Sequence, residues 1–432
     1  MLTQTFGPFT RTISPPTCPP DCPVRLPGFA KGNAAYFGLD DSLLRRSVLL
    51  LGAARSGKSY TESKLIAQIK PRLRPQDAMV ILDTKGEYQE QFYAPGDLVV
   101  GSGGPSVGTF IGWNLFLDCI KGCQSDEEVI QRIGMMADRI FYKENTQTPY
   151  FTDAPRRVFE ELVFTLLCHK DLIPAPHVLD NAGLLAFLQR GDWKAFLRCC
   201  SAPEEMTAYI GTGSRSQQTP TERSVLAELY INLTNQLHGV WAGHGGFSMM
   251  GFEKDRKGQT LFLQYDPKDG GASKQVYRLL LDLLLVGLMD GKNRNGRLYL
   301  FLDEIALLGE SPEMLIEAIN YGPGVGLGGI VVGCQSLAQL YQMCGKDGAN
   351  TLLAGLQTRI MFHTEDEISR NFVKEQCATA ETTTITYIPG ISFQPVAGKT
   401  ENAITDEELN RMGLGDAIIK QPSYPAFTFH FT

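Results

Sequence analysis

The sequence has no uncharged apolar run of the roughly 18 residues that a membrane-spanning helix requires. Its most apolar stretch, from Leu279 to Met289, is too short and contains Asp282. Residues 1–27 have no apolar core of the kind found in secretory signal peptides. We therefore expect neither a transmembrane helix in this sequence nor export through a signal peptide.

An excess of basic residues is also missing, because 40 Lys and Arg stand against 47 Asp and Glu and give a formal net charge of −7. This balance gives no support to broad affinity for nucleic acid, although it leaves room for a local basic track. Zinc-type spacing is absent as well: the 10 cysteines include two CxxxC pairs, at 18/22 and 119/123, without a matching histidine array. Free thiols in a reducing compartment are the favoured interpretation.

The overall composition is that of a soluble globular protein, with 43% apolar and 20% charged residues. A length of 432 residues exceeds what one hydrophobic core usually serves, so two domains are expected. Residues 1–33 are rich in proline, with six between Pro15 and Pro27. This density is incompatible with regular helix and predicts an N-terminal arm that is extended or disordered.

Short apolar runs in two parts of the sequence are typical of strands buried on both faces of a parallel sheet. These runs cover residues 47–51, 78–83, 97–100, 260–264, 298–303, 329–334 and 359–363. Helical patterns lie between most of them, and such alternation indicates a parallel sheet with right-handed crossovers. The predicted fold class is therefore α/β with a mostly parallel central sheet.

The region between residues 120 and 250 differs, because it shows helical spacing without convincing strand runs. Its helical segments are residues 125–143, 154–169, 181–199 and 219–238. We interpret this region as an all-α domain that interrupts one α/β domain. The expected division is an N-terminal arm (1–33), two halves of the α/β domain (34–119 and 251–432) and the all-α domain between these halves (120–250).

A phosphate-binding pattern follows the first predicted strand. Residues 52–59 read Gly-Ala-Ala-Arg-Ser-Gly-Lys-Ser and fit GxxxxGK[ST] between a strand and a helix. Backbone N–H groups of such a loop surround a phosphate, and the helix N-terminus adds its dipole. Lys58 would reach the β- and γ-phosphates, and Ser59 would ligate Mg²⁺. The residues expected to bind nucleotide here are Gly52, Ala53, Arg55, Ser56, Gly57, Lys58 and Ser59.

Such a site also needs a carboxylate at the end of a neighbouring strand. Asp303 closes an apolar run and would orient Mg²⁺ through water, while Glu304 would polarise the attacking water. Asp83 also ends a predicted strand and is a second candidate at the same edge, with a helix cap or a loop charge as an equally open interpretation. Gln335 follows another strand and would sense the γ-phosphate or the water, with a helix cap as the alternative.

Taken together, these motifs resemble those of one family, the TraG/TraD-like coupling proteins of type IV secretion and conjugation systems. The family pattern is similar in the order and spacing of three segments that follow the phosphate loop. These are Asp-Thr-Lys-Gly-Glu at 83–87, the pair Asp303-Glu304 with Leu308-Gly309, and Gln-Ser-Leu-Ala-Gln-Leu at 335–340. Residues 341–354 are similar to its Tyr-Gly-x-x-Gly-Ala segment, with one glycine offset. The resemblance covers roughly residues 45–425, and generic phosphate-loop proteins lack both the Lys-Gly-Glu and the Gln-Ser-Leu motifs.

The resemblance implies a RecA-like P-loop ATPase that binds ATP and Mg²⁺ and forms a ring, hexameric when active. It implies that the protein recruits a relaxase–DNA complex or an effector protein, handles single- or double-stranded DNA, and delivers this cargo to components of a type IV secretion channel. The all-α domain would face the cytoplasm and receive the cargo. The expected location is cytoplasmic, at the inner membrane through partners.

Two departures from the family pattern are relevant. Members usually begin with two membrane-spanning helices, which are absent here, so we expect a soluble variant, a separate membrane-anchor partner or a shortened chain. Some relatives carry an arginine after the Asp-Glu helix that reaches a neighbour's nucleotide, and residues 321–326 contain none. Arg359 as a substitute and Arg359 as a structural residue are both open. We expect the isolated chain to be largely monomeric.

Two alternative functions remain beside the coupling ATPase. One is the other large ATPase of these secretion systems, which energises pilus assembly and has a similar segment after its phosphate loop. Lys85 and the run 335–340 favour the coupling protein. The other is a weakly hydrolysing scaffold that docks substrate proteins and uses nucleotide for assembly only.

Overall fold

The protein is described from a computed structural model. The structure describes residues 2–6, 13–102, 107–108, 110–141, 150–266, 273–308, 313–377, 379–388, 391–402 and 404–432. The chain forms two compact units. The first unit comprises residues 1–83, 257–260 and 293–432, and the second comprises residues 84–256 and 261–292.

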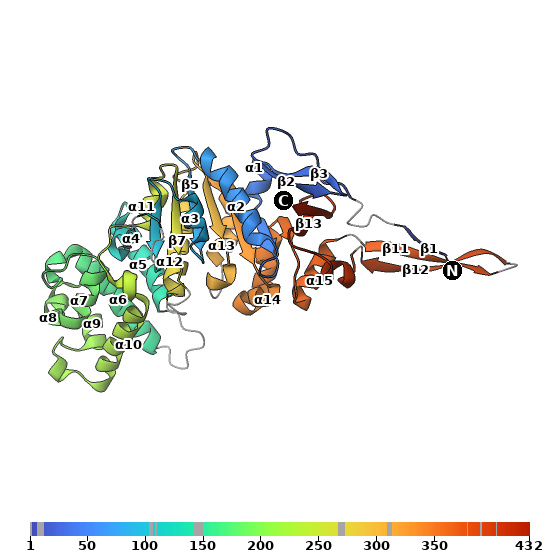
Figure 1. Cartoon of the computed structure of the whole chain (residues 1–432). Helices are drawn as coiled ribbons and strands as arrows, with labels where there is room; N and C mark the ends of the chain where they lie inside the picture. The colour runs from blue at the N-terminus through green and yellow to red at the C-terminus, as the bar shows by residue number, and fades with distance from the viewer. Residues whose placement is uncertain are drawn as a thin grey trace. The chain divides into compact units, whose positions relative to one another are not determined.

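The first unit is built on a sheet whose strands are ordered β3-β2-β14-β13-β10-β4-β9-β8-β5 (Figure 1). These strands are β2 (Val24–Ala30), β3 (Asn33–Leu39), β4 (Val48–Leu51), β5 (Ala78–Asp83), β8 (Leu298–Leu302), β9 (Leu327–Cys334), β10 (Thr358–Met361), β13 (Asp416–Lys420) and β14 (Phe427–Phe431). From β10 to β5 every neighbouring pair is parallel, whereas β13, β14, β2 and β3 are added antiparallel. The predicted α/β class with a mostly parallel sheet is therefore confirmed.

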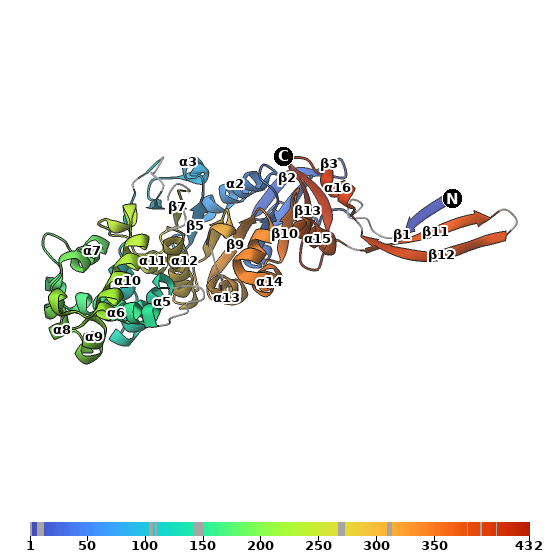
Figure 2. The same cartoon turned by 90° about the horizontal axis from the view of Figure 1, so that it is seen from below.

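Helices cover both faces of this sheet. Figure 2 shows α2 on one face and α13 and α14 on the other. The helices of the first unit are α1 (Asp41–Arg45), α2 (Lys58–Ile69), α13 (Glu313–Tyr321), α14 (Leu337–Gly355), α15 (Glu367–Gln376) and α16 (Asp406–Asn410). All residues of β4, β5 and β9 are buried, as expected for strands covered on both faces.

Glycine permits one unusually close strand approach in this sheet. A Cβ atom placed on Gly333, near the end of β9, would lie 2.1 Å from the backbone oxygen of Asp303, which follows β8. No side chain can occupy that space, so only glycine allows β9 to lie this close to the end of β8.

The second unit is predominantly helical. Its helices are α3 (Glu87–Phe92), α4 (Leu115–Ile120), α5 (Asp126–Ile140), α6 (Tyr150–Cys168), α7 (Asn181–Arg190), α8 (Trp193–Cys199), α9 (Pro203–Ile210), α10 (Pro220–Gln236), α11 (Met249–Lys254) and α12 (Lys274–Met289). Strands β6 (Leu98–Gly101) and β7 (Gln259–Gln264) pair in parallel. Within described residues 121–141 and 150–248 there are helices and no β-strand.

The predicted domain limits remain a prediction. The compact unit that holds the helices of residues 120–250 also includes residues 84–119 and 261–292. The predicted arm, residues 1–33, contains strand β2 of the sheet and strand β1 (Leu2–Phe6). Strand β1 pairs antiparallel with β11 (Thr379–Ile388), which pairs in turn with β12 (Ile391–Asn402). Among the described residues, no helix has both the length and the apolar character needed to span a bilayer.

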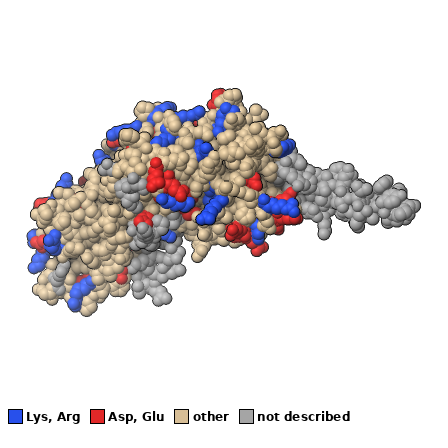
Figure 3. Space-filling model, in the orientation of Figure 1, with Lys and Arg blue, Asp and Glu red and all other residues tan. Residues whose placement is uncertain are grey.

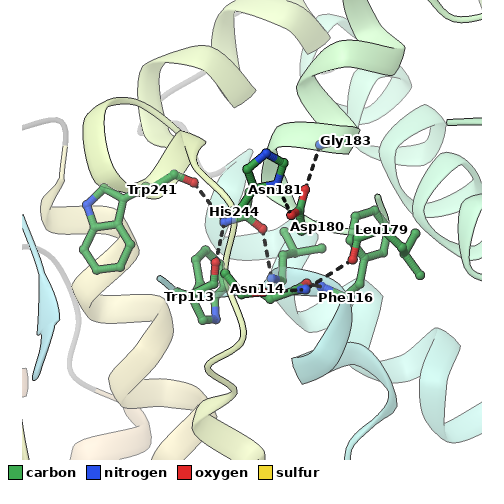
Figure 4. Close-up of polar contacts among 11 residues, drawn as sticks. Trp113, Asn114, Phe116, Leu179, Asp180, Asn181, Gly183, Trp241 and His244 are labelled. Atoms are coloured by element: carbon green, nitrogen blue, oxygen red, sulfur yellow. Dashed lines mark hydrogen bonds and ion pairs between the residues drawn. The ribbon is translucent and has the colours of Figure 1, made fainter. Parts of the chain in front are cut away.

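A buried polar cluster joins α4, α7 and residues 241–245 inside the second unit (Figure 4). Asn114 caps α4 by accepting the N–H of Phe116 at 3.0 Å, and its amide donates to the carbonyl oxygens of Leu179 and Gly245 at 3.2 and 3.1 Å. Asp180 caps α7 and accepts a hydrogen bond from Nδ1 of His244 at 2.6 Å.

Asn181 is the fully buried centre of this cluster. Its side-chain oxygen accepts the N–H of Leu115 at 3.0 Å, and its Nδ2 donates to the carbonyl oxygens of Trp113 and Trp241 at 3.0 and 2.9 Å. One side chain therefore satisfies three buried backbone groups from two separate segments. Such groups are costly to leave unpaired, so Asn181 is a fixed point of this unit.

We predict that Asn181→Ala lowers the free energy of unfolding of the second unit by about 3 kcal/mol, because it leaves three backbone groups without partners. All three tryptophans of the chain lie in this unit, at positions 113, 193 and 241, so urea unfolding followed by tryptophan fluorescence measures it selectively. Asn235→Ala, at an exposed site on α10, is the matched control and is expected to change the value by less than about 0.5 kcal/mol. Equal effects of the two substitutions would contradict the assignment.

Candidate active site

The phosphate loop lies between the end of β4 and the start of α2. Its first residues are fixed by neighbouring strands, since the N–H of Gly52 donates to the Cys334 oxygen at 3.1 Å and that of Ala53 to the His363 oxygen at 2.8 Å. Arg55 and Gly57 have positive φ angles of 60° and 119°. These left-handed turns curl the loop into α2, and glycine is the residue that adopts them without strain.

Lys58 points back into the loop. Its side chain is buried, and its ammonium group donates to the carbonyl oxygen of Gly52 and to that of Ala53, the latter at 3.2 Å. The cation therefore lies in the concavity that the loop forms ahead of α2. A phosphate entering this space would meet both the ammonium group and the N-terminus of a 12-residue helix.

Two carboxylates lie side by side at the same edge of the sheet. Strands β5 and β8 are parallel with Leu82 opposite Leu302, so the next residues, Asp83 and Asp303, follow in register. Both aspartates are buried, with 0% and 8% of their surface exposed. Because β8, β9 and β4 are also parallel, these carboxylates share the carboxyl edge of the sheet with the phosphate loop. The structure thus brings Asp83 and Asp303 together, and their roles remain predictions.

Glu304 has an unusual environment for a carboxyl group. Burial raises its pKa to about 7, and the N–H of Ala306 and the charge of Lys58 only partly offset this effect. Its Oε1 accepts the Ala306 N–H at 3.4 Å, while its Oε2 is buried without a hydrogen-bond partner. A carboxyl group with a raised pKa and an unsatisfied oxygen is suited to accept a proton from a bound water.

Gln335 follows β9 at this edge, and its side chain is exposed. The cap of α14 is the next residue, Ser336, whose hydroxyl accepts the Ala338 N–H at 3.1 Å. Gln335 therefore does not cap this helix. Its side chain interacts with Glu304, which places its amide beside the candidate base. Its catalytic role remains a prediction.

Arg359 is committed to contacts within its own subunit. Its guanidinium group donates to the carbonyl oxygens of Leu353 and Leu356 at 2.8 and 3.1 Å and to the side chain of Gln376. The group also lies over the ring of Phe372 at 5.3 Å, and burial lowers its pKa. Of the two interpretations left open by the sequence, these contacts favour the structural one.

Sequence reasoning did not identify the support that the C-terminal strands give to the loop. The N–H of Gly415 donates to the Ser56 oxygen at 3.2 Å, and the Gly415 oxygen accepts the N–H of Phe431 at 2.9 Å. Gly415 has φ of 84°, and a Cβ atom there would lie 2.7 Å from the Phe431 oxygen. No motif marks this contact, because it joins residues that are far apart in the sequence.

The visible surface carries mixed charge. Figure 3 shows Lys and Arg interspersed with Asp and Glu on this face, rather than one continuous basic patch. This distribution agrees with the net charge of −7. Affinity for a polyanion on this face would therefore depend on local sites.

A family profile described as "Type IV secretion-system coupling protein DNA-binding domain" matches residues 34–392. Coupling protein TraD of Escherichia coli (strain K12) is 25% identical over 322 residues, which are 72% of this chain and 41% of TraD. This chain therefore spans less than half the length of that relative.

Solved structures share the fold. The coupling protein TrwB in complex with ADP and Mg²⁺ has a TM-score of 0.67 at 19% identity, and its unbound monoclinic form has 0.69; each comparison covers 91% of this chain and 87% of the other. VirB4 of Thermoanaerobacter pseudethanolicus has a TM-score of 0.57 at 12% identity, covering 96% of this chain and 98% of VirB4. At these identities the structural likeness demonstrates the fold alone. The family profile covers most of the sequence, and on that basis this chain belongs to the coupling-protein family of type IV secretion systems.

Proposed function

We propose that this chain is the ATP-hydrolysing part of a coupling protein that drives DNA or DNA-linked protein toward a type IV secretion channel. The observation that carries the proposal is one edge of the sheet that holds a phosphate loop with a buried Lys58 and, beside it, Glu304 with a raised pKa. TrwB has been solved with ADP and Mg²⁺ and with a non-hydrolysable ATP analogue, which supports the same ligands here.

In the proposed reaction the loop binds the β- and γ-phosphates. Backbone N–H groups of the loop and the N-terminus of α2 face the phosphate oxygens. Lys58 exchanges its contacts with the carbonyl oxygens of Gly52 and Ala53 for the phosphate, since a charged acceptor forms the stronger hydrogen bond. The lysine thereby neutralises part of the charge that hydrolysis transfers to the leaving ADP.

The residues present fit a magnesium ion. Mg²⁺ prefers hard oxygen ligands in octahedral geometry and keeps several waters, and here Ser59 offers a hydroxyl and Asp303 a carboxylate at one edge of the sheet. When bound, the ion would neutralise charge on the β- and γ-phosphate oxygens. Asp83, next to Asp303 in register, offers a further carboxylate for a bound water.

Glu304 then acts on the attacking water. A bond forms between the water oxygen and the γ-phosphorus, the bond from this phosphorus to the bridging oxygen breaks, and its electron pair leaves with ADP. The proton of the water passes to the Glu304 carboxylate, and Gln335 orients the water through its amide. Hydrolysis yields ADP and inorganic phosphate, and the motor uses the cycle to move cargo.

The proposed partners follow from the family. They are DNA, a relaxase or effector protein, and channel components that would hold the chain at the cytoplasmic face of the inner membrane. One observation favours the weakly hydrolysing scaffold: residues 321–326 contain no arginine, and Arg359 is bound within its own subunit. The two functions are separated by the rate of ATP turnover with and without single-stranded DNA.

We predict different losses for Lys58→Ala and Glu304→Gln. The first removes the cation that faces the phosphates and should abolish most affinity for ATP, whereas the second keeps binding and lowers kcat by about a hundredfold or more. Equilibrium binding of a fluorescent ATP analogue and a phosphate-release assay measure the two effects. If Glu304→Gln bound nucleotide as poorly as Lys58→Ala, the division of roles would be wrong.

We predict that turnover depends on pH through Glu304. The carboxylate is the active base, so kcat should rise as pH increases through about 7 and reach a plateau above it.

The folded state binds the Glu304 proton more tightly than the unfolded state, in which the pKa of this residue is near 4.5. Glu304 therefore makes the fold less stable as pH rises from 4.5 to 7. Glu304→Gln should remove this loss of unfolding free energy, which reaches up to about 3 kcal/mol at pH 8. A kcat profile that is flat between pH 5.5 and 8 would contradict this role.

We predict that the isolated chain is largely monomeric at micromolar concentration with Mg-ATP, and that single-stranded DNA shifts it toward a ring. A polyanion that binds only the assembled form favours that form by mass action. Sedimentation velocity measures the assembly, and turnover per subunit should rise with protein concentration and with DNA. A stable hexamer without DNA would contradict the first expectation, and turnover that DNA leaves unchanged would favour the scaffold.

A further inference from the structure

The CxxxC pair formed by Cys18 and Cys22 lies just ahead of strand β2. Both thiols are free in the structure, and Cys22 is two residues before the strand begins. The N–H of Cys22 donates to the carbonyl oxygen of Pro19 at 3.1 Å, so the chain reverses its direction between the two cysteines. The spacing seen in the sequence is therefore folded into a tight turn.

The two sulfur atoms meet beside Gly38 of β3. A Cβ atom placed on Gly38 would lie 2.6 Å from Sγ of Cys18 and 3.2 Å from Sγ of Cys22. Both sulfurs thus occupy the space that a side chain at this position would need. Burial raises the pKa of the Cys22 thiol, and the neighbouring Cys18 thiol raises it further. The fold therefore holds the two thiols together against one strand.

The two thiols differ in their access to solvent. Cys18 is partly exposed, whereas Cys22 is 8% exposed and its thiol donates to the carbonyl oxygen of Val24 at 3.3 Å. A reagent from solution consequently meets Cys18 first, with Cys22 behind it. An accessible thiol next to a second thiol that can displace the reagent is the arrangement of redox-active cysteine pairs.

Contacts on both sides of the turn hold this segment on the sheet. Ser14 accepts two hydrogen bonds at 3.0 Å, one at its carbonyl oxygen from the hydroxyl of Tyr424 and one at its Oγ from Nζ of Lys31. After the turn, the N–H of Arg25 in β2 donates to Oε1 of Gln68 in α2 at 2.8 Å. The turn with both cysteines is thus tied to the sheet at each end, so folding itself brings the thiols together.

The second CxxxC pair has the same spacing in a different arrangement. Cys119 is fully buried in α4, and its thiol faces Sδ of Met136 at 3.7 Å. The thiol of Cys123 donates to the carbonyl oxygen of Cys119 at 3.3 Å. Burial raises the pKa of the Cys119 thiol well above its ordinary value. Because the thiolate is the nucleophile, this pair is protected from oxidation although its spacing is identical.

We propose that Cys18 and Cys22 form a redox-active dithiol, which a low-molecular-weight disulfide such as oxidised glutathione converts into an intramolecular disulfide. The inference is independent of the proposed ATPase function. The bridge would close the turn at the point where the N-terminal segment enters the sheet.

The reaction is a double thiol–disulfide exchange. The Cys18 thiolate attacks one sulfur of the oxidant, a mixed disulfide forms, and the other half of the oxidant leaves as a thiolate that takes up a proton. The Cys22 thiolate then attacks the Cys18 sulfur, and the bond from this sulfur to the small molecule breaks. The chain loses two hydrogen atoms with two electrons, and the oxidant is reduced to two thiols.

The test is a redox titration in glutathione buffers, read by mass spectrometry after acid quenching, alkylation and digestion. Trypsin releases residues 12–25 as one peptide that contains both cysteines. Its disulfide form carries no alkyl group and is two hydrogen atoms lighter than the dithiol. A bridge between Cys119 and Cys123 would instead link two tryptic peptides, because Lys121 lies between them.

We expect the peptide 12–25 of the native chain to be half oxidised at a ratio of oxidant to thiol at least about tenfold lower than in urea, because the fold holds the sulfurs in contact. The pair Cys119/Cys123 should stay alkylated throughout the native titration. Equal titration in the native chain and in urea would overturn the inference, since spacing alone would then explain the bridge. A Cys119–Cys123 bridge at the same ratio would overturn it as well.

Single substitutions test the order of attack. Cys22→Ser keeps the accessible thiol and should accumulate a mixed disulfide with glutathione on Cys18, whereas Cys18→Ser should react at least about tenfold more slowly at the buried Cys22. Equal rates for the two variants would contradict the assignment of Cys18 as the attacking thiol. Cys168→Ser, which removes an exposed thiol on α6, is the matched control and should leave the titration of the peptide 12–25 unchanged.

Discussion

The spacing of the carboxyl edge depends on the close approach of β9 to the end of β8. The absent side chain of Gly333 admits the backbone oxygen of Asp303 into its place. Because β4 is paired with β9 on its other side, the same approach determines how far the phosphate loop lies from Asp303 and Glu304. A larger residue in place of Gly333 would separate the loop from both carboxyl groups without altering either.

Burial at this edge serves the chemistry as well as the fold. Strand β8, which Asp303 and Glu304 follow, is almost entirely buried, and burial raises the pKa of Glu304 to about 7. An ordinary glutamate would be a weak base at neutral pH, whereas this one is matched to the proton that it must accept. The cost is a buried oxygen without a hydrogen bond, which a bound water would satisfy.

Sequence patterns were sufficient for the features that are local in the chain. The phosphate loop is contiguous, and the buried parallel strands are continuous apolar runs, so the α/β fold and the order of its motifs could be predicted. The register that places Asp83 beside Asp303 is different, because pairing between β5 and β8 leaves no mark in either strand. For the same reason the support that Gly415 gives to the phosphate loop was visible only in the folded chain.

The hydrogen bonds of Gly415 have a mechanical consequence. Its N–H is bonded to Ser56 in the loop, and its oxygen to the N–H of Phe431 in β14, whose neighbour Thr432 bonds to Pro27 of β2. Gly415 therefore connects the phosphate loop to β14, which pairs with β13 on one side and with the N-terminal strand β2 on the other. A movement of the phosphate loop would therefore be transmitted through backbone hydrogen bonds to the antiparallel strands at the margin of the sheet.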